Sequence, residues 1–66
     1  MTVTKDKIRM SLSRAEAADR LAQIAQQLRD GSVSLGGPDF AVANDVELKA
    51  VAEHDKLEFE VKWRRA

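Results

Sequence analysis

The feature that most constrains this chain is an alternation of apolar and charged side chains over residues 45–64. If the chain turns between His54 and Asp55, the apolar residues meet in pairs: Ala52 with Leu57, Ala50 with Phe59, Leu48 with Val61, and Val46 with Trp63. The same register pairs opposite charges on the other face: Glu53 with Lys56, Lys49 with Glu60, Glu47 with Lys62, and Asp45 with Arg64. Only Val51 against Glu58 breaks the pattern. A slip of one residue would exchange the two faces, so the pattern predicts a β-hairpin of fixed register.

A helix is predicted before this hairpin, over about residues 14–29. Ser13 and Glu16 have the spacing of a capping box, in which each side chain binds the backbone N–H of the other residue. Gly31 follows at the position where a left-handed residue ends many helices. One apolar stripe runs along the helix and consists of Ala17, Leu21, Ile24 and Leu28.

Alternation of period two predicts three further strands. Ile8, Met10 and Leu12 share one face of a short strand before the helix. After the helix, a turn at residues 36–39 (GGPD) predicts a hairpin that pairs Leu35 with Phe40 and Val33 with Val42. The predicted fold class is therefore α+β, in the order β-α-β-β-β-β. We expect a single domain over residues 1–66, with one mostly antiparallel sheet and one helix packed on its apolar face. The sequence leaves the strand order open, although pairing of the first strand with the last is preferred.

Composition narrows the class of protein. The 66-residue chain has no cysteine, which excludes disulfides and thiolate metal sites and favours a reducing compartment, so we expect a cytoplasmic location. Its eleven basic and eleven acidic residues cancel, which leaves no overall field to attract nucleic acid or an anionic membrane. The first ten residues, MTVTKDKIRM, lack the apolar stretch of a signal peptide, and no apolar run is long enough to span a membrane.

Residue types that carry chemistry are present but isolated. His54 is the only histidine and lies at a predicted turn, where its neighbours point in different directions, so no metal site is expected. Glu58 and Glu60 share a face, but the register places Lys49 opposite Glu60 and nothing excludes water there. The serines have no nearby base, and Gly36-Gly37 lacks the lysine of a phosphate loop. We therefore expect no catalytic residues, no cofactor and no small-molecule substrate.

The helix SRAEAADRLAQIAQQL, the VSL strand and the closing strand LEFEVKW together resemble the amphi-Trp domain family of bacteria and archaea. Trp63 matches the tryptophan for which the family is named. The resemblance covers most of the chain and implies the small α+β architecture, but it implies no activity. The basic ending Arg64-Arg65 need not be general in the family, so any role for it rests on this chain only.

A mismatch of size points toward a binding function. Five strands would make a face about 19 Å across, whereas one helix is about 10–12 Å wide with its side chains. Part of the apolar face should therefore stay uncovered, as an interface in a homodimer or with another protein. The expected interaction residues are Trp63, Phe59, Met10, Leu12, Arg64 and Arg65. The alternative is a single-stranded nucleic-acid binder that uses Trp63 with the cations Lys62, Arg64 and Arg65, although its aromatic residues belong to the face that the helix should cover.

Overall fold

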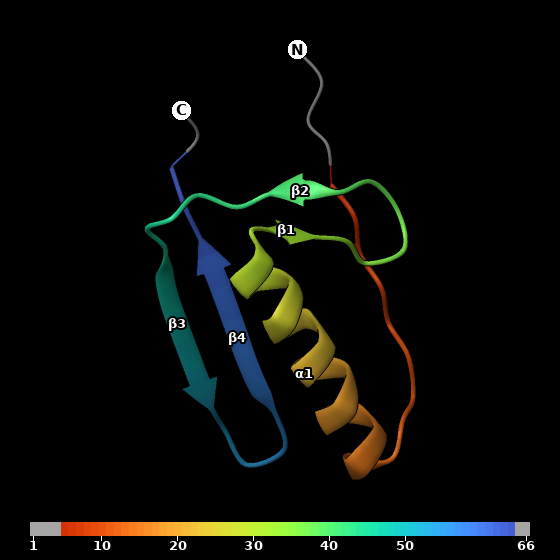
Figure 1. The fold of residues 1–66 in the computed structure, drawn as a ribbon. Coiled ribbons are helices and arrows are strands. Elements are labelled where there is room, and N and C mark those ends of the chain that lie inside the picture. Colours follow the sequence, from red (N-terminus) through yellow and green to blue (C-terminus); the bar gives the residue numbers. More distant parts are fainter. Residues whose placement is uncertain (1–4, 65–66) are drawn as a thin grey trace.

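The computed structural model of the chain describes residues 5–64 and consists of one helix and four strands. The helix α1 spans Arg14–Asp30. The strands are β1 (Ser32–Val33), β2 (Phe40–Ala41), β3 (Glu47–Ala52) and β4 (Leu57–Lys62), as Figure 1 shows. The α+β class, the single helix and the antiparallel pairing of strands are confirmed.

Both predicted ends of α1 are confirmed by their hydrogen bonds. The Ser13 hydroxyl accepts the Glu16 N–H at 3.1 Å, and a Glu16 carboxylate oxygen accepts the Ser13 N–H at 3.0 Å, which completes the capping box. At the other end Gly31 adopts a left-handed conformation with φ of 91°, and its N–H binds the carbonyls of Gln27 and Leu28. These bonds satisfy backbone groups that every helix end leaves without a partner inside the helix.

The β3–β4 hairpin has the predicted register. Its pairs run from Ala52 opposite Leu57 to Glu47 opposite Lys62, and they include Val51 opposite Glu58. The Glu53 N–H donates to the Lys56 carbonyl at 2.9 Å, so the hairpin turns through His54 and Asp55. Apolar and charged residues therefore occupy opposite faces of this sheet, as the alternation requires.

The β1–β2 hairpin is antiparallel as predicted, but its register was predicted wrongly. Val33 pairs with Phe40 and not with Val42, whose N–H donates instead to the Gly31 carbonyl at 2.9 Å. The physical reason is the loop between β1 and β2, which hydrogen bonds of Ser34 hold in place. The Ser34 hydroxyl donates to the Gly37 carbonyl at 3.2 Å and accepts the Gly36 N–H at 3.3 Å, while the Ser34 N–H donates to the Gln27 side chain at 2.7 Å. Ser34 and Leu35 thus belong to the loop, which shortens the ladder.

The prediction of one five-stranded sheet needs two corrections. Residues 5–13 are not a strand, because they run along α1 on the side away from β4 (Figure 1), and the backbone groups of a helix are already bonded within it. The four strands form two separate two-stranded sheets, β1–β2 and β3–β4. The chain bends at Asn44 and Asp45, and in Figure 1 the segment between β2 and β3 crosses the end of β4, so the β1–β2 hairpin does not extend the β3–β4 sheet.

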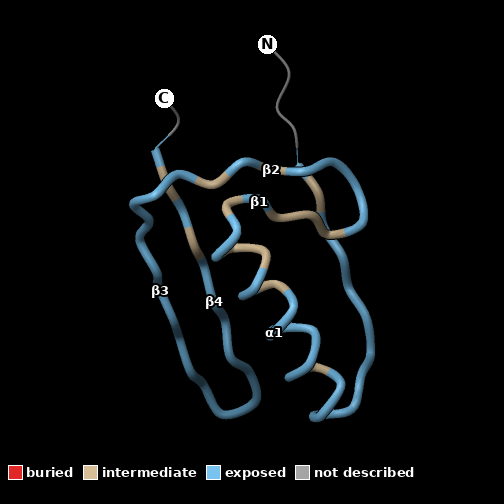
Figure 2. The backbone as a smooth tube through the Cα atoms, viewed as in Figure 1, coloured by how far each residue is buried: buried red, intermediate tan, exposed pale blue. Residues whose placement is uncertain are grey.

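No residue within 5–64 is fully buried, as Figure 2 shows. The better covered positions gather where the C-terminal half of α1 approaches the β1–β2 hairpin, and they include Ile24, Leu28, Val33 and Phe40. Val61 and Trp63, at the end of β4, are also half-buried. Among the described residues α1 packs directly against β1 and not against β3 or β4, so residues 5–64 lack a closed hydrophobic core.

Candidate interaction surface

The apolar face of the β3–β4 hairpin carries the three most exposed large apolar side chains of residues 5–64. It carries Leu48, Ala50 and Ala52 from β3 and Leu57, Phe59 and Val61 from β4. Leu48 is 66% exposed, Leu57 is 67% exposed and Phe59 is 56% exposed. Large apolar side chains that gather on one exposed face are typical of an interaction site. We refer to these six residues together with Trp63 as the apolar face.

The predicted interaction residues fall into two groups. Phe59 lies in β4, and Trp63 and Arg64 follow directly after it; Trp63 is half-buried and Arg64 is exposed. Met10 and Leu12 are 45% and 41% exposed, but they lie on the N-terminal segment, which follows the other side of α1 (Figure 1). The structure therefore does not bring these two residues to the apolar face. Arg65 lies outside the described residues.

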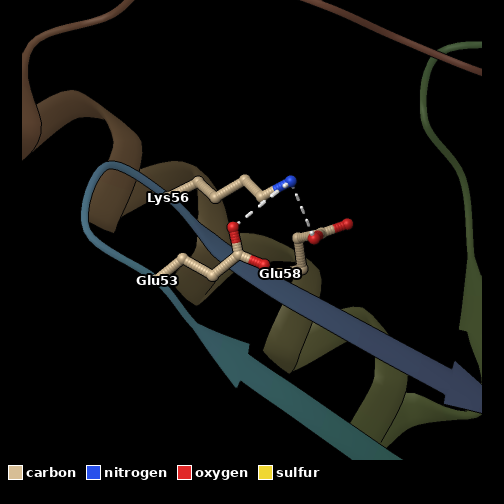
Figure 3. A network of polar contacts seen from close by, with 3 residues as sticks. All are labelled: Glu53, Lys56 and Glu58. Carbon is tan, nitrogen blue, oxygen red and sulfur yellow. Dashed lines mark ion pairs between the residues drawn. The ribbon is translucent and has the colours of Figure 1, made fainter.

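The opposite face of the hairpin carries charges of both signs. Lys56 contacts Glu53 at 3.7 Å and Glu58 at 3.4 Å, as Figure 3 shows, and Lys62 contacts Glu47 at 3.8 Å. All these side chains are more than half exposed, so each ion pair stabilises the fold by about 0–1 kcal/mol. The pairs mainly fix the register, and Lys62 already has a local carboxylate partner.

A shallow pocket on this charged face is lined by Lys49, Val51, Glu58, Phe59 and Glu60. It is open to solvent, and its carboxylates lie beside a lysine. Glu58 and Glu60 are exposed in the same strand, so water reaches both carboxylates.

One carboxyl group has a clearly perturbed pKa. Hydrogen bonds from the Ser13 backbone and then from the Ser13 side chain lower the pKa of Glu16 below its ordinary value of 4.5. The cause is the capping box, because these bonds stabilise the ionised carboxylate. Glu16 is fully exposed, so its perturbed pKa is a feature of the helix end.

His54 lies exposed at the hairpin tip, and residues 5–64 contain no group of three or more histidine, cysteine or carboxylate side chains placed to hold a metal ion. Within that range no helix has the length and apolar character needed to cross a membrane.

Comparisons with known proteins found no matching family model, no similar curated protein and no similar solved structure. The resemblance to the amphi-Trp family therefore stays a prediction that rests on the helix start, the alternating strand and Trp63.

Sequence reasoning missed one contact that links distant parts of the chain. The Asp6 carboxylate lies against Gly37, close enough that a Cβ atom built at Gly37 would come within 2.7 Å of Asp6 Oδ2. Asp6 Oδ1 accepts the Lys7 N–H at 3.1 Å, whereas Oδ2 is buried without a hydrogen-bond partner among residues 5–64. Local sequence patterns do not predict this contact, because Asp6 and Gly37 lie in different segments and alternation within one segment carries no information about the other.

Proposed function

We propose that this chain is a small non-catalytic interaction module that associates with a second copy of itself through the apolar face. One observation carries the proposal: no residue of 5–64 is fully buried, while Leu48, Leu57 and Phe59 are each more than half exposed on one side of one hairpin. A chain of this size has a thin margin of stability even when its core is closed. Covering this face from outside supplies the missing burial.

The energetic argument is one of area. Full burial of a leucine or phenylalanine side chain stabilises a protein by about 1.5–3 kcal/mol relative to leaving it exposed. In a dimer each of these side chains is buried once in each copy. Burial of Leu48, Leu57 and Phe59 is therefore enough to offset several kcal/mol of lost translational and rotational freedom. The balanced charge of the chain removes the overall repulsion that would oppose self-association.

Sedimentation equilibrium of the wild-type chain and of Phe59→Ala tests the proposal. We expect a wild-type dimer that persists at high salt, because apolar burial is not screened. Phe59→Ala should weaken the dimer about tenfold or more, since it removes a large apolar side chain from each copy. Val51→Ala is the matched control, because Val51 lies on the opposite face of the same hairpin. A monomer at every concentration, or equal effects of the two variants, would contradict self-association.

The nucleic-acid alternative predicts a different result. Arg64 is exposed beside the half-buried Trp63, which supports a small basic and aromatic contact. However, Lys62 is paired with Glu47, and the charged face carries acids as well as bases. Salt-sensitive retention of the chain on single-stranded nucleic acid, lost in Arg64→Ala, would favour this alternative over self-association.

A further inference from the structure

We propose that the second copy binds by antiparallel pairing of β4 with the β4 of the partner subunit, centred on Val61. This inference rests on the proposed self-association and specifies its geometry. The two hairpins would form one continuous four-stranded sheet, with both apolar faces on the same side. Backbone hydrogen bonds across the junction would add to the apolar contact, as in other cases of strand addition at a sheet edge.

The outer edge of β4 pairs with no strand among residues 5–64. β4 pairs with β3 on one side, and on its other side α1 runs alongside it without packing directly against its backbone (Figure 1). Neighbouring strands of a sheet lie about 4.7–4.9 Å apart, so no described helix or strand backbone occupies the place of a next strand.

The direction of the backbone groups of β4 follows from the hairpin. The hydrogen bond from the Glu53 N–H to the Lys56 carbonyl makes these two residues a hydrogen-bonded pair. Bonded and non-bonded pairs alternate along an antiparallel ladder. The N–H and carbonyl groups of Leu57, Phe59 and Val61 therefore point away from β3, toward the free edge. A dimer centred on Val61 places residues of this outward set opposite one another, which is the arrangement that backbone pairing needs.

The pairing of charges favours this register over registers centred on neighbouring residues of β4. With Val61 opposite the partner's Val61, Glu60 faces the partner's Lys62, and Glu58 faces the partner's Arg64. By symmetry the junction contains four pairs of opposite charge and no pair of like charge. A junction centred on Phe59 would place Glu58 opposite the partner's Glu60, and one centred on Lys62 would place this lysine opposite the partner's Lys62. Like charges directly opposite each other destabilise a sheet.

The same register accounts for the residue that does not fit its own hairpin. Glu58 lies opposite Val51 within the chain, and its ion pair among residues 5–64 is with Lys56, two residues earlier, at 3.4 Å. In the dimer it gains the partner's Arg64. On the apolar face, Phe59 lies opposite the partner's Trp63, which forms an aromatic cross-strand pair from two side chains that one copy leaves exposed or half-exposed.

Disulfide trapping tests the geometry, because the chain contains no cysteine of its own. At the centre of the junction the two Cα atoms of position 61 would lie about 5.5 Å apart, which suits a disulfide. Val61→Cys should therefore form a covalent dimer under mild oxidation. Leu48→Cys is the matched control, because Leu48 lies directly opposite Val61 on β3, so that its two copies would be about 14 Å apart, three strand spacings. Efficient trapping of Leu48→Cys but not of Val61→Cys would overturn the proposal.

Charge exchange gives a second measurement that does not depend on Val61. Glu58→Arg and Arg64→Glu each place like charges opposite one another and should raise the dimer dissociation constant about threefold to tenfold. The double variant Glu58→Arg/Arg64→Glu restores opposite charges and should return to within about twofold of the wild type. Additive weakening in the double variant would overturn the proposed register.

The two proposals fail in different ways. A wild-type dimer in sedimentation that neither traps through Val61→Cys nor recovers in the double charge variant would overturn the β4 junction and leave self-association intact. A wild-type monomer at every concentration would overturn both.

Discussion

At the scale of single residues, the capping box is the clearest case in which the sequence alone was sufficient to predict the structure. Ser13 and Glu16 are three positions apart, and each satisfies a backbone group of the other, so the motif needs nothing from the rest of the fold. The contact of Asp6 with Gly37 is the opposite case. It depends on how the N-terminal segment passes the 34–39 loop, and no spacing in the sequence encodes that passage.

The lowered pKa of Glu16 predicts a pH dependence of stability. A carboxyl group whose pKa is lower in the folded than in the unfolded chain stabilises the fold above its unfolded pKa. This stabilisation should be complete above about pH 4.5 to 5 and should be lost as the pH falls through the lowered folded pKa. Glu16→Gln should show a smaller loss of stability between pH 6 and pH 3, measured by denaturant unfolding. An equal loss in both proteins, or an NMR titration of the Glu16 carboxyl at its ordinary pKa, would contradict the prediction.

At the scale of elements, the reliability of each prediction followed the number of residues that specified it. The β3–β4 hairpin has pairs along both faces, and all six positions of its ladder keep the predicted register. The β1–β2 hairpin has only two residues in each strand, so hydrogen bonds of Ser34 in the loop outweighed the apolar pairing. Ile8, Met10 and Leu12 alternate like a strand, but alternation cannot show whether a sheet edge lies within reach.

The link between the N-terminal segment and the 34–39 loop gives a test at this scale. A side chain at Gly37 would displace the Asp6 carboxylate, so Gly37→Ala should loosen the segment and destabilise the fold by up to about 1 kcal/mol. In an Asp6→Ala background the obstacle is absent, and the same substitution should be neutral or slightly stabilising, because alanine restricts the unfolded chain. The measurement is a double-mutant cycle by denaturant unfolding, with an expected coupling of about 0.5–1 kcal/mol. Strict additivity would show that the contact carries no energy.

At the scale of the whole molecule, the size mismatch noted from the sequence had the right direction but the wrong cause. One helix does fail to cover the available apolar surface, as expected. However, the exposed surface comes from a single two-stranded hairpin and not from a five-stranded sheet. The two hairpins do not join into one sheet, because the chain bends at Asn44 and Asp45 between β2 and β3. Single-residue patterns do not encode such an angle between hairpins.

If a second copy completes the apolar face, the thermal stability of the chain should depend on its concentration. Dimerisation stabilises the folded state by mass action, so the melting temperature should rise with each tenfold increase in concentration. Circular dichroism over a hundredfold range measures this, and Phe59→Ala should show a weaker rise than Val51→Ala. A melting temperature that is constant across the range would indicate that the isolated chain already has its full stability.

The order of contacts along the chain also bears on how quickly the protein assembles. The contacts between elements join sequence neighbours: α1 with β1, β1 with β2, and β3 with β4. Such local structure forms fast, with helices relaxing within about 1 μs and hairpins closing within about 1–10 μs. If the chain self-associates as proposed, folding should therefore show a rapid first-order phase that is followed by a slower second-order phase limited by the encounter of two copies. Between these two phases each newly made chain would present an unpaired strand edge. The rate at which a second copy is encountered would then decide between correct pairing and aggregation.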